Sequence, residues 1–242
     1  ASKNLGKELA IKFSNLGCKV SLLSRNKQRL IKLHKSIGGY KNGHEYHAID
    51  LLKEEKLHLY LEKIFNKKKS FDIIVHTLGG ALGINNPLAE VNDWYKVLRF
   101  NVGISIQINN FFIPKMLKKK WGRIIHISSI TGEIGEDIGG PIPYSASKAY
   151  LNNYVKSIGK FYAKKNIIIS AVMPGALSSK GKYWEKVKKT NPKILKKFLE
   201  NKQSIGRLGK VSEVSPFIVL LASEYSSFAS GAIFPIHGGW NY

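Results

Sequence analysis

Short runs of apolar residues alternate along this chain with longer amphipathic stretches. The runs at 72–77 and 167–173 are rich in Ile and Val, which is typical of strands buried on both faces of a parallel sheet. The pattern predicts strands at 18–24, 45–50, 72–77, 123–129, 167–173 and 232–236.

The amphipathic stretches predict the helices. These are expected at 6–17, 26–38, 53–66, 92–118, 144–164 and 211–223, with further helical structure near 182–201. Strands that alternate with helices in this way favour an α/β fold, namely a doubly wound parallel sheet with right-handed crossovers. Because no linker, repeat or low-complexity block interrupts the pattern, we expect residues 1–242 to form a single domain.

The composition limits the classes of partner. The chain has 39 Lys and Arg against 16 Asp and Glu, a formal charge of +23. Nearly all of the basic residues are Lys, whereas proteins that read nucleic acids rely on the planar fork of Arg. We therefore interpret the charge as solvated helix faces and expect no nucleic-acid partner.

Cysteine content and hydropathy narrow the setting further. Cys18 is the only cysteine, which excludes an internal disulfide and a cysteine-based zinc site. No apolar run approaches the roughly 18 residues of a membrane span, and there is no signal-peptide pattern. The seven histidines show no metal-ligand spacing. The sequence thus favours a cytoplasmic protein with no membrane partner and no metal site.

Four motifs carry the candidate chemistry. Asn101 lies in RFNVGIS, Ser129 ends RIIHISS, Tyr144 and Lys148 form YSASK, and Pro174-Gly175 follows a strand. In this order, and with the C-terminal IHGGW similar to a VDGG ending, the chain resembles the short-chain dehydrogenase/reductase family over essentially its whole length. YxxxK alone would be a weak signal, but the combination is specific.

Tyr144 and Lys148 stand four residues apart, so they share one helix face. An ammonium close to a phenol favours the phenolate and lowers the pKa of the tyrosine. The resemblance implies that Tyr144 is the general acid/base and that Lys148 tunes it and binds the nicotinamide ribose. It also implies that Ser129 hydrogen-bonds the substrate oxygen and that Asn101 holds a water relay.

The spacing leaves one assignment open. Fourteen residues separate Ser129 from Tyr144, two more than is usual in the family. A loop insertion in the intervening TGEIGEDIGGPIP is the simplest account. In the other register, Thr131 is the catalytic hydroxyl; we prefer Ser129 because it ends a predicted strand.

The N-terminal segment supplies the first candidate cofactor residues. Ser2, Lys3, Asn4 and Gly6 resemble the tail of TGxxxGxG, a turn in which backbone N–H groups approach a pyrophosphate. Asn4 replaces a glycine, and asparagine tolerates positive φ better than other residues.

The ends of the second and third strands carry the next candidates. Ser24 stands where an acidic residue would hold the ribose of NAD, and Arg25 follows it. Arg25 and Lys3 therefore favour the 2′-phosphate of NADP, which we expect as the cofactor. The resemblance places Asp50 and Leu51 at the adenine.

The remaining cofactor candidates follow later strands. Gly79, in a segment that replaces the family's NNAG, still permits close approach of the cofactor. After Pro174 and Gly175, the backbone of Leu177 is expected at the carboxamide, and Ser179 stands where a threonine usually contacts the cofactor.

The chain opens directly in a predicted helix, where a doubly wound nucleotide fold begins with a strand. We therefore expect that the first strand is missing and that the chain is an N-terminally truncated fragment. The basic stretch 180–202 is expected to be a mobile substrate lid, with Trp184 and Phe198 facing either the substrate or the core. We expect His126 to be a satisfied core residue and His237 to belong to a turn.

The predicted function is an NADP(H)-dependent interconversion of a ketone and a secondary alcohol. A 3-oxoacyl-[acyl-carrier-protein] reductase is an alternative, with Lys118–Lys120 and Lys165 as docking residues for an acidic acyl-carrier protein. A reductase of sugar derivatives and an NADP-binding protein without turnover also remain open. The family resemblance implies a homo-oligomer, a dimer or tetramer, built through helices 92–118 and 144–164.

Overall fold

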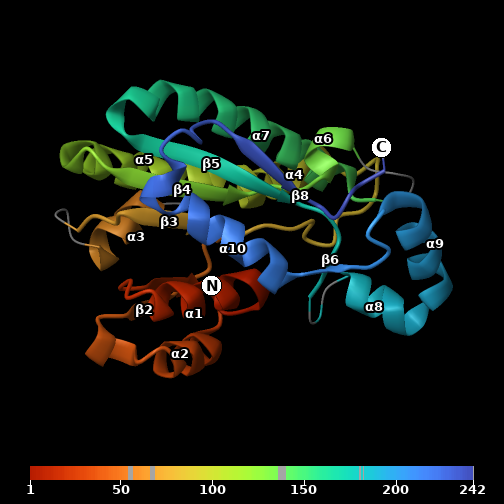
Figure 1. The fold of residues 1–242 in the computed structure, drawn as a ribbon, viewed down its shortest axis with the longest axis horizontal. Helices are drawn as coiled ribbons and strands as arrows, with labels where there is room; N and C mark the ends of the chain where they lie inside the picture. The colour runs from red at the N-terminus through yellow and green to blue at the C-terminus, as the bar shows by residue number, and fades with distance from the viewer. Residues whose placement is uncertain (54–56, 66–68, 136–139, 180, 182, 242) are drawn as a thin grey trace.

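A computed structural model describes residues 1–53, 57–65, 69–135, 140–179, 181 and 183–241. Strands are flanked by helices, and α5 and α7 cover one side of the larger sheet (Figure 1). The strands are β1 (Ser21–Ser24), β2 (Glu45–Ala48), β3 (Ile73–His76), β4 (Gly122–Ile127), β5 (Ile167–Pro174), β6 (Leu177–Ser178), β7 (Gly209–Lys210) and β8 (Ile233–Ile236). Every strand in the described residues pairs in parallel with its neighbours, which confirms the predicted α/β class.

The helices match the predicted amphipathic stretches closely. They are α1 (Asn4–Asn15), α2 (Lys27–Ser36), α3 (Leu57–Ile64), α4 (Val91–Leu98), α5 (Ile104–Lys119), α6 (Thr131–Ile134), α7 (Ile142–Tyr162), α8 (Tyr183–Thr190), α9 (Pro192–Lys202) and α10 (Val211–Leu221). Parts of the predicted helices 53–66 and 182–201, and part of the proposed loop insertion, lie outside the described residues.

The predicted helix 92–118 is interrupted. A π-helical turn, Arg99–Gly103, joins α4 to α5 and contains Asn101. Such turns are rare in proteins, and those that occur often lie at functional sites. The helical structure expected near 182–201 consists of α8 and α9, because Asn191 and Pro192 stop the first and begin the second.

The sheet is divided into two larger parts, where the sequence predicted one. β3, β4, β5 and β8 form a four-stranded sheet in that order, and β1 and β2 form a separate pair. Among the described residues, the edge of β1 away from β2 meets the Ala1 ammonium, which donates to the Leu23 carbonyl at 2.8 Å. No ladder hydrogen bonds join β1 to β3 among the described residues. The expectation of a missing first strand stays a prediction.

Burial follows this division. Every residue of β5 is buried, as are most of β4, whereas all four residues of β3 are only partly buried. Ile125, Val172, Val214 and Ile218 form one core with α1 and α10 on one side of the larger sheet. Ile124, Ile169 and Met116 form another with α5 on the other side. These two cores fix the carboxyl ends of β4 and β5, where the candidate site residues follow.

Candidate active site

Lys148 lies at the centre of the candidate site. Its side chain is almost fully buried, and its Nζ donates to the Ile127 carbonyl at 2.7 Å. Nζ is 5.6 Å from the centroid of the Tyr144 ring, one helical turn earlier on α7. Because burial disfavours the ammonium, the pKa of Lys148 falls to about 7. A basic group and a phenol are thus placed side by side at the end of β4.

Asn101 and Gly79 close the other side of Lys148. Asn101 Oδ1 accepts from the Gly80 N–H at 2.9 Å, and its Nδ2 donates to the Gly80 and Val97 carbonyls. A Cβ on Gly79 would lie 2.8 Å from Asn101 Oδ1 and 3.3 Å from Lys148 Nζ. Glycine at this position therefore keeps the three residues in close contact.

Both candidate hydroxyls lie together. Ser129 Oγ is 3.1 Å from Thr131 Oγ1, at the end of β4 and the start of α6. The Thr131 carbonyl accepts a hydrogen bond from Ser145, the residue after Tyr144. The structure thus ties this hydroxyl pair to the helix that carries Tyr144 and Lys148, and it leaves the choice between Ser129 and Thr131 open.

The candidate pyrophosphate turn begins α1. Asn4 has φ 46°, the left-handed backbone conformation that its position was expected to need. Lys3, the N-cap of α1, makes no capping hydrogen bond through its side chain. A Cβ on Gly6 would lie 3.0 Å from Ala1 Cα and from Thr77 Oγ1. The first turn of α1 therefore leaves backbone N–H groups for an anion, beside the segment that follows β3.

The candidate residues for the adenosine half follow β1 and β2. Ser24 Oγ is 2.8 Å from Ser2 Oγ, which joins the end of β1 to the turn before α1. Arg25 is largely exposed, and its Nη1 lies 3.8 Å from Asp50 Oδ2. Leu51 is buried in the core between α3 and α5, so its side chain is unavailable to an adenine and only its backbone could contact one. The role of Leu51 at the adenine stays a prediction.

The candidates after β5 lie next to the C-terminal segment. The Gly175 N–H donates to the Ile236 carbonyl at 3.2 Å, and a Cβ on Gly175 would meet His237 at 2.9 Å. Leu177 pairs with Gly209 between β6 and β7. Ser179 comes directly after β6, ahead of α8.

Trp184 and Phe198 pack against each other. Their ring centroids are 3.9 Å apart, and Phe198 is 5.6 Å from Trp240 near the C-terminus. The two aromatic residues thus hold α8 and α9 to each other and to the last residues of the chain.

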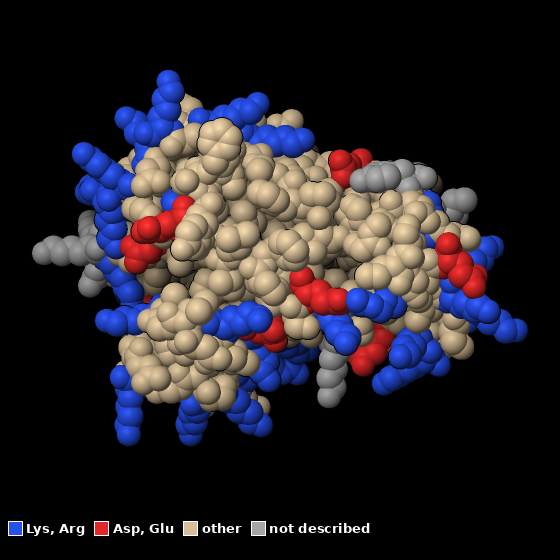
Figure 2. Space-filling view, viewed as in Figure 1, with Lys and Arg blue, Asp and Glu red and all other residues tan. Residues whose placement is uncertain are grey.

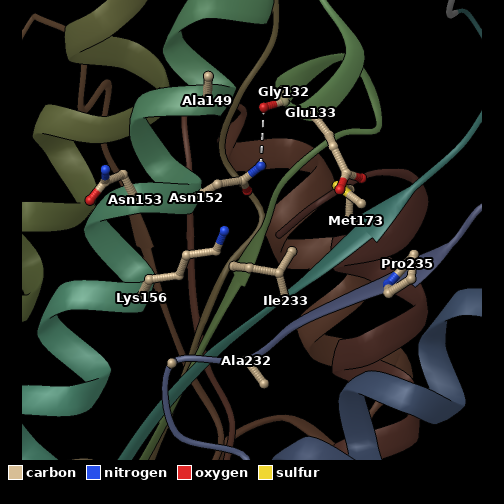
Figure 3. Close-up of a pocket in the computed structure, with 11 residues that line it drawn as sticks. Gly132, Glu133, Ala149, Asn152, Asn153, Lys156, Met173, Ala232, Ile233 and Pro235 are labelled. Carbon is tan, nitrogen blue, oxygen red and sulfur yellow. Dashed lines mark hydrogen bonds between the residues drawn. The ribbon is translucent and has the colours of Figure 1, made fainter.

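A hollow of about 780 Å³ lies between α7 and β8 (Figure 3). Its lining includes Glu133, Asn152 and Lys156 but none of the four predicted catalytic residues. Asn152 donates to the Gly132 carbonyl here and also accepts from Ser128. We therefore assign this hollow no part in the catalytic site.

Comparison with known proteins identifies the family. A family model described as enoyl-(acyl carrier protein) reductase matches residues 1–241. The chain belongs to the short-chain dehydrogenase/reductase family. It is an oxidoreductase of that family, acting on CH–OH and C=O groups.

The similarity to individual relatives covers nearly the whole chain. It is 28% identical to the 3-oxoacyl-[acyl-carrier-protein] reductase of Aquifex aeolicus, over 99% of this chain and 94% of that protein. It is 30% identical to the enzyme of the same name from Buchnera aphidicola subsp. Schizaphis graminum, over 99% and 93%.

Solved structures show the same fold. The 3-oxoacyl (acyl-carrier-protein) reductase of Agrobacterium tumefaciens, solved with NADP bound, has a TM-score of 0.86 at 22% identity and covers 98% of this chain and 90% of its own. The L-sorbose reductase of Gluconobacter frateurii, complexed with NADPH and L-sorbose, has a TM-score of 0.83 at 24% identity, over 98% and 92%.

Sequence reasoning missed several features of the site. The Arg25–Asp50 ion pair and the Ser2–Ser24 hydrogen bond join residues that the sequence placed in separate roles. His126 is fully buried, as expected, but its Nδ1 has no hydrogen-bond partner among the described residues, so it is not the satisfied core residue that was expected. The sequence did hold one signal of this buried polar group, namely the polar residues within the otherwise apolar strand RIIHISS.

Proposed function

We propose that this chain is a single-domain NADP(H)-dependent reductase that interconverts a ketone and a secondary alcohol, with Tyr144 as the general acid/base. The observation that carries the proposal is the burial of Lys148 among Gly79, Asn101 and Tyr144. A lysine is rarely buried without a role, since burial disfavours its charged form.

When bound, the nicotinamide supplies the hydride. Tyr144 donates the proton to the carbonyl oxygen, and the nearby Lys148 ammonium favours the phenolate that remains. Ser129 or Thr131 donates a hydrogen bond to the same oxygen as negative charge develops there. Asn101 holds the Gly80 backbone beside Lys148 and keeps this side of the site fixed.

The residues present fit a dinucleotide. Ser2, Lys3, Asn4 and Gly6 would hold the pyrophosphate at the first turn of α1, whose N–H groups and dipole favour an anion. Gly79 allows the cofactor to approach Lys148 and Tyr144 closely. Pro174, Gly175, Leu177 and Ser179 would line the carboxamide side, and Asp50 with the Leu51 backbone the adenine.

Arg25 supports NADP over NAD. No carboxylate stands at Ser24 to hold a ribose hydroxyl, and Arg25 follows it with Lys3 also exposed. The contact of Arg25 with Asp50 is long and solvent-exposed, so it stabilises little and leaves the guanidinium able to bind a phosphate. The NADP and NADPH named for the similar structures agree with this choice.

For the substrate we favour a 3-oxoacyl group carried on an acyl-carrier protein, as named for the relatives. The docking role of Lys118–Lys120 and Lys165 stays a prediction. Lys118–Lys120 end α5 and Lys165 precedes β5, so they lie at the amino ends of β4 and β5, whereas the catalytic residues follow the carboxyl ends. A parallel sheet separates its two ends by the whole length of its strands.

Helices α8 and α9, part of the expected lid, offer a better placed basic surface for an acidic carrier. Lys186, Lys188, Lys189, Lys193, Lys196 and Lys197 of α8 and α9 are all exposed, and they follow the carboxyl end of β5. Figure 2 shows basic side chains along much of the outline of the molecule, so position rather than charge density favours the lid. A sugar-derived ketone is the second candidate, favoured by the similarity to L-sorbose reductase.

We also propose a homo-oligomer through α4, α5 and α7. Between α4 and α7 a hollow of about 250 Å³ is lined by Trp94, Leu98 and Pro143, with the exposed rings of Tyr95 and Tyr150 beside it. Exposed aromatic rings around an apolar hollow are typical of a contact surface.

No described helix is long and apolar enough to cross a membrane.

The test is oxidation of NADPH, followed by absorbance, with 3-oxoacyl thioesters and a panel of sugar ketones. Exchanging Lys186, Lys188 and Lys189 for Glu should raise KM for a carrier-bound substrate and leave KM for a short thioester unchanged. Absence of turnover with every ketone, despite NADPH binding, would contradict the proposal and leave a binding protein.

A further inference from the structure

Four polar side chains from four elements meet beneath the catalytic residues. Asn109 of α5 accepts from His76 Nε2 of β3 at 2.8 Å through its Oδ1. Its Nδ2 lies 3.3 Å from His126 Nε2 of β4 and 3.0 Å from the Tyr154 hydroxyl of α7. The two imidazoles stack at 4.5 Å. Asn109, fully buried, is the hub of this cluster.

The amide fixes the protonation of both imidazoles. Its oxygen can only accept, so His76 carries a proton on Nε2; its nitrogen can only donate, so His126 Nε2 is bare and its proton sits on Nδ1. An imidazolium at His126 would direct an N–H toward the amide N–H groups. Burial acts in the same direction, lowering the pKa of His76 to about 4 and that of His126 well below its ordinary value.

The cluster also belongs to elements that carry the predicted catalytic residues. His76 is three residues before Gly79, His126 is three residues before Ser129, and Asn109 is two helical turns after Asn101. Tyr154 continues the helix of Tyr144 and Lys148. One residue, Asn109, thus joins the β3, β4 and α7 elements that bring Gly79, Ser129 and Lys148 together.

The charge of His126 also connects the cluster to the catalytic residues. The groups that face His126 are His76 and Lys148, both of which oppose its protonation, and those that face Tyr154 are Tyr150 and Tyr162. A positive imidazole at 126 would in turn disfavour the Lys148 ammonium, on which the function of Tyr144 rests.

We propose that Asn109 is a positioning residue for the reductase site: it holds His126 neutral behind Lys148 and locks β3, β4 and α7 together. The inference rests on the proposed function for its kinetic consequence, but the state of His126 can be measured without turnover.

The decisive variant is Asn109→Asp. A carboxylate accepts at both oxygens and so stabilises a charged imidazole in the same space. Asn110→Asp is the matched control, because Asn110 is the next residue of α5 and is exposed. The measurements are kcat and kcat/KM against pH, thermal unfolding, and NMR of 15N-labelled histidine.

In the parent protein we expect His126 to carry its proton on Nδ1 and to stay neutral through the pH range in which an exposed histidine titrates. In Asn109→Asp we expect an imidazole to titrate above pH 6, with kcat about tenfold below the parent value near pH 6 and equal to the parent value at pH 9. Adding His126→Asn to that variant should restore kcat near pH 6, because the charge is removed. Asn110→Asp should follow the parent profile.

Three results would overturn the proposal. One is a parent His126 that titrates above pH 6 or carries its proton on Nε2, which NMR shows even if Asn109→Asp does not fold. The second is a loss of kcat in Asn109→Asp that is the same at every pH, as a purely structural defect would give. The third is no loss at all. A parent with neutral His126 but no turnover would instead count against the proposed function.

Discussion

Gly132, at the start of α6, lies in direct contact with the backbone of Lys148. A Cβ on residue 132 would be 2.7 Å from both the carbonyl carbon and the Cβ of Lys148. Asn152 holds the same contact by donating to the Gly132 carbonyl at 3.3 Å. The close approach of α6 to α7 therefore sets where Lys148 leaves its helix.

We expect Gly132→Ala to move α7 and lower both stability and kcat. Overpacking of this kind costs about 1–3 kcal/mol, which thermal unfolding would show. Gly103→Ala is the control, since its Cβ would meet only the Arg99 side chain, at 3.6 Å. A Gly132→Ala protein with parental kcat and melting temperature would show that the contact is not required.

Tyr144→Phe should abolish most turnover while cofactor binding is retained. The change removes the proton donor and keeps the ring, and general acid catalysis contributes about 10²–10⁴-fold. Steady-state kcat and NADPH fluorescence titration separate the two effects. Retention of more than about a tenth of kcat would exclude Tyr144 as the acid.

Ser129→Ala and Thr131→Ala decide which hydroxyl acts on the substrate. Their oxygens are 3.1 Å apart, so either could be placed toward a bound ketone. Loss of the hydroxyl that stabilises developing charge should lower kcat by about 10²-fold or more. We expect this for Ser129 and only a small change for Thr131; the reverse pattern would assign Thr131.

The protein should prefer NADPH to NADH by about tenfold or more, because charge-assisted contacts to a phosphate contribute about 1.5–3 kcal/mol each. Ser24→Asp combined with Arg25→Ala should reverse the preference, as measured by kcat/KM for both cofactors. Equal kcat/KM values in the parent protein would contradict the role of Arg25.

The protein should lose stability between about pH 6.5 and pH 4. The pKa of His76 is lowered from 6.5 to about 4 by burial, so the unfolded chain binds a proton in this range and the folded one does not. The loss from this group approaches about 3 kcal/mol below pH 4. Urea unfolding at several pH values would show it, and His76→Asn should flatten the slope. An unchanged slope in that variant would rule out His76 as its source.

Much of the fold could be predicted because its signals are local. The Ile and Val runs of β4 and β5 and the caps of α2 and α9 depend on neighbours in sequence. The division of the sheet at β1 and β3 could not be, since strand pairing is a long-range property that apolar runs do not encode.

The candidate site shows the same limit. Tyr144 and Lys148 were visible as a spaced pair on one helix face. The contacts of Gly79, Gly132 and Asn109 with distant residues were not, because a glycine or a buried amide carries no sign of what approaches it.

The π-helical turn that contains Asn101 resolves a conflict of helical phase. The buried residues Val97, Asn101, Ser105, Asn109 and Ile113 recur strictly every fourth residue. At 100° per residue, an unbroken α-helix would rotate the last of them about 160° away from the first. The π-helical turn at Arg99–Gly103 contains one more residue than an α-helical turn, and this reduces the rotation. As a result α4 faces α7 while α5 faces the sheet. A regular α-helix through the same residues would set Asn101 and Asn109 about 80° apart around its axis, and the wider turn reduces that angle.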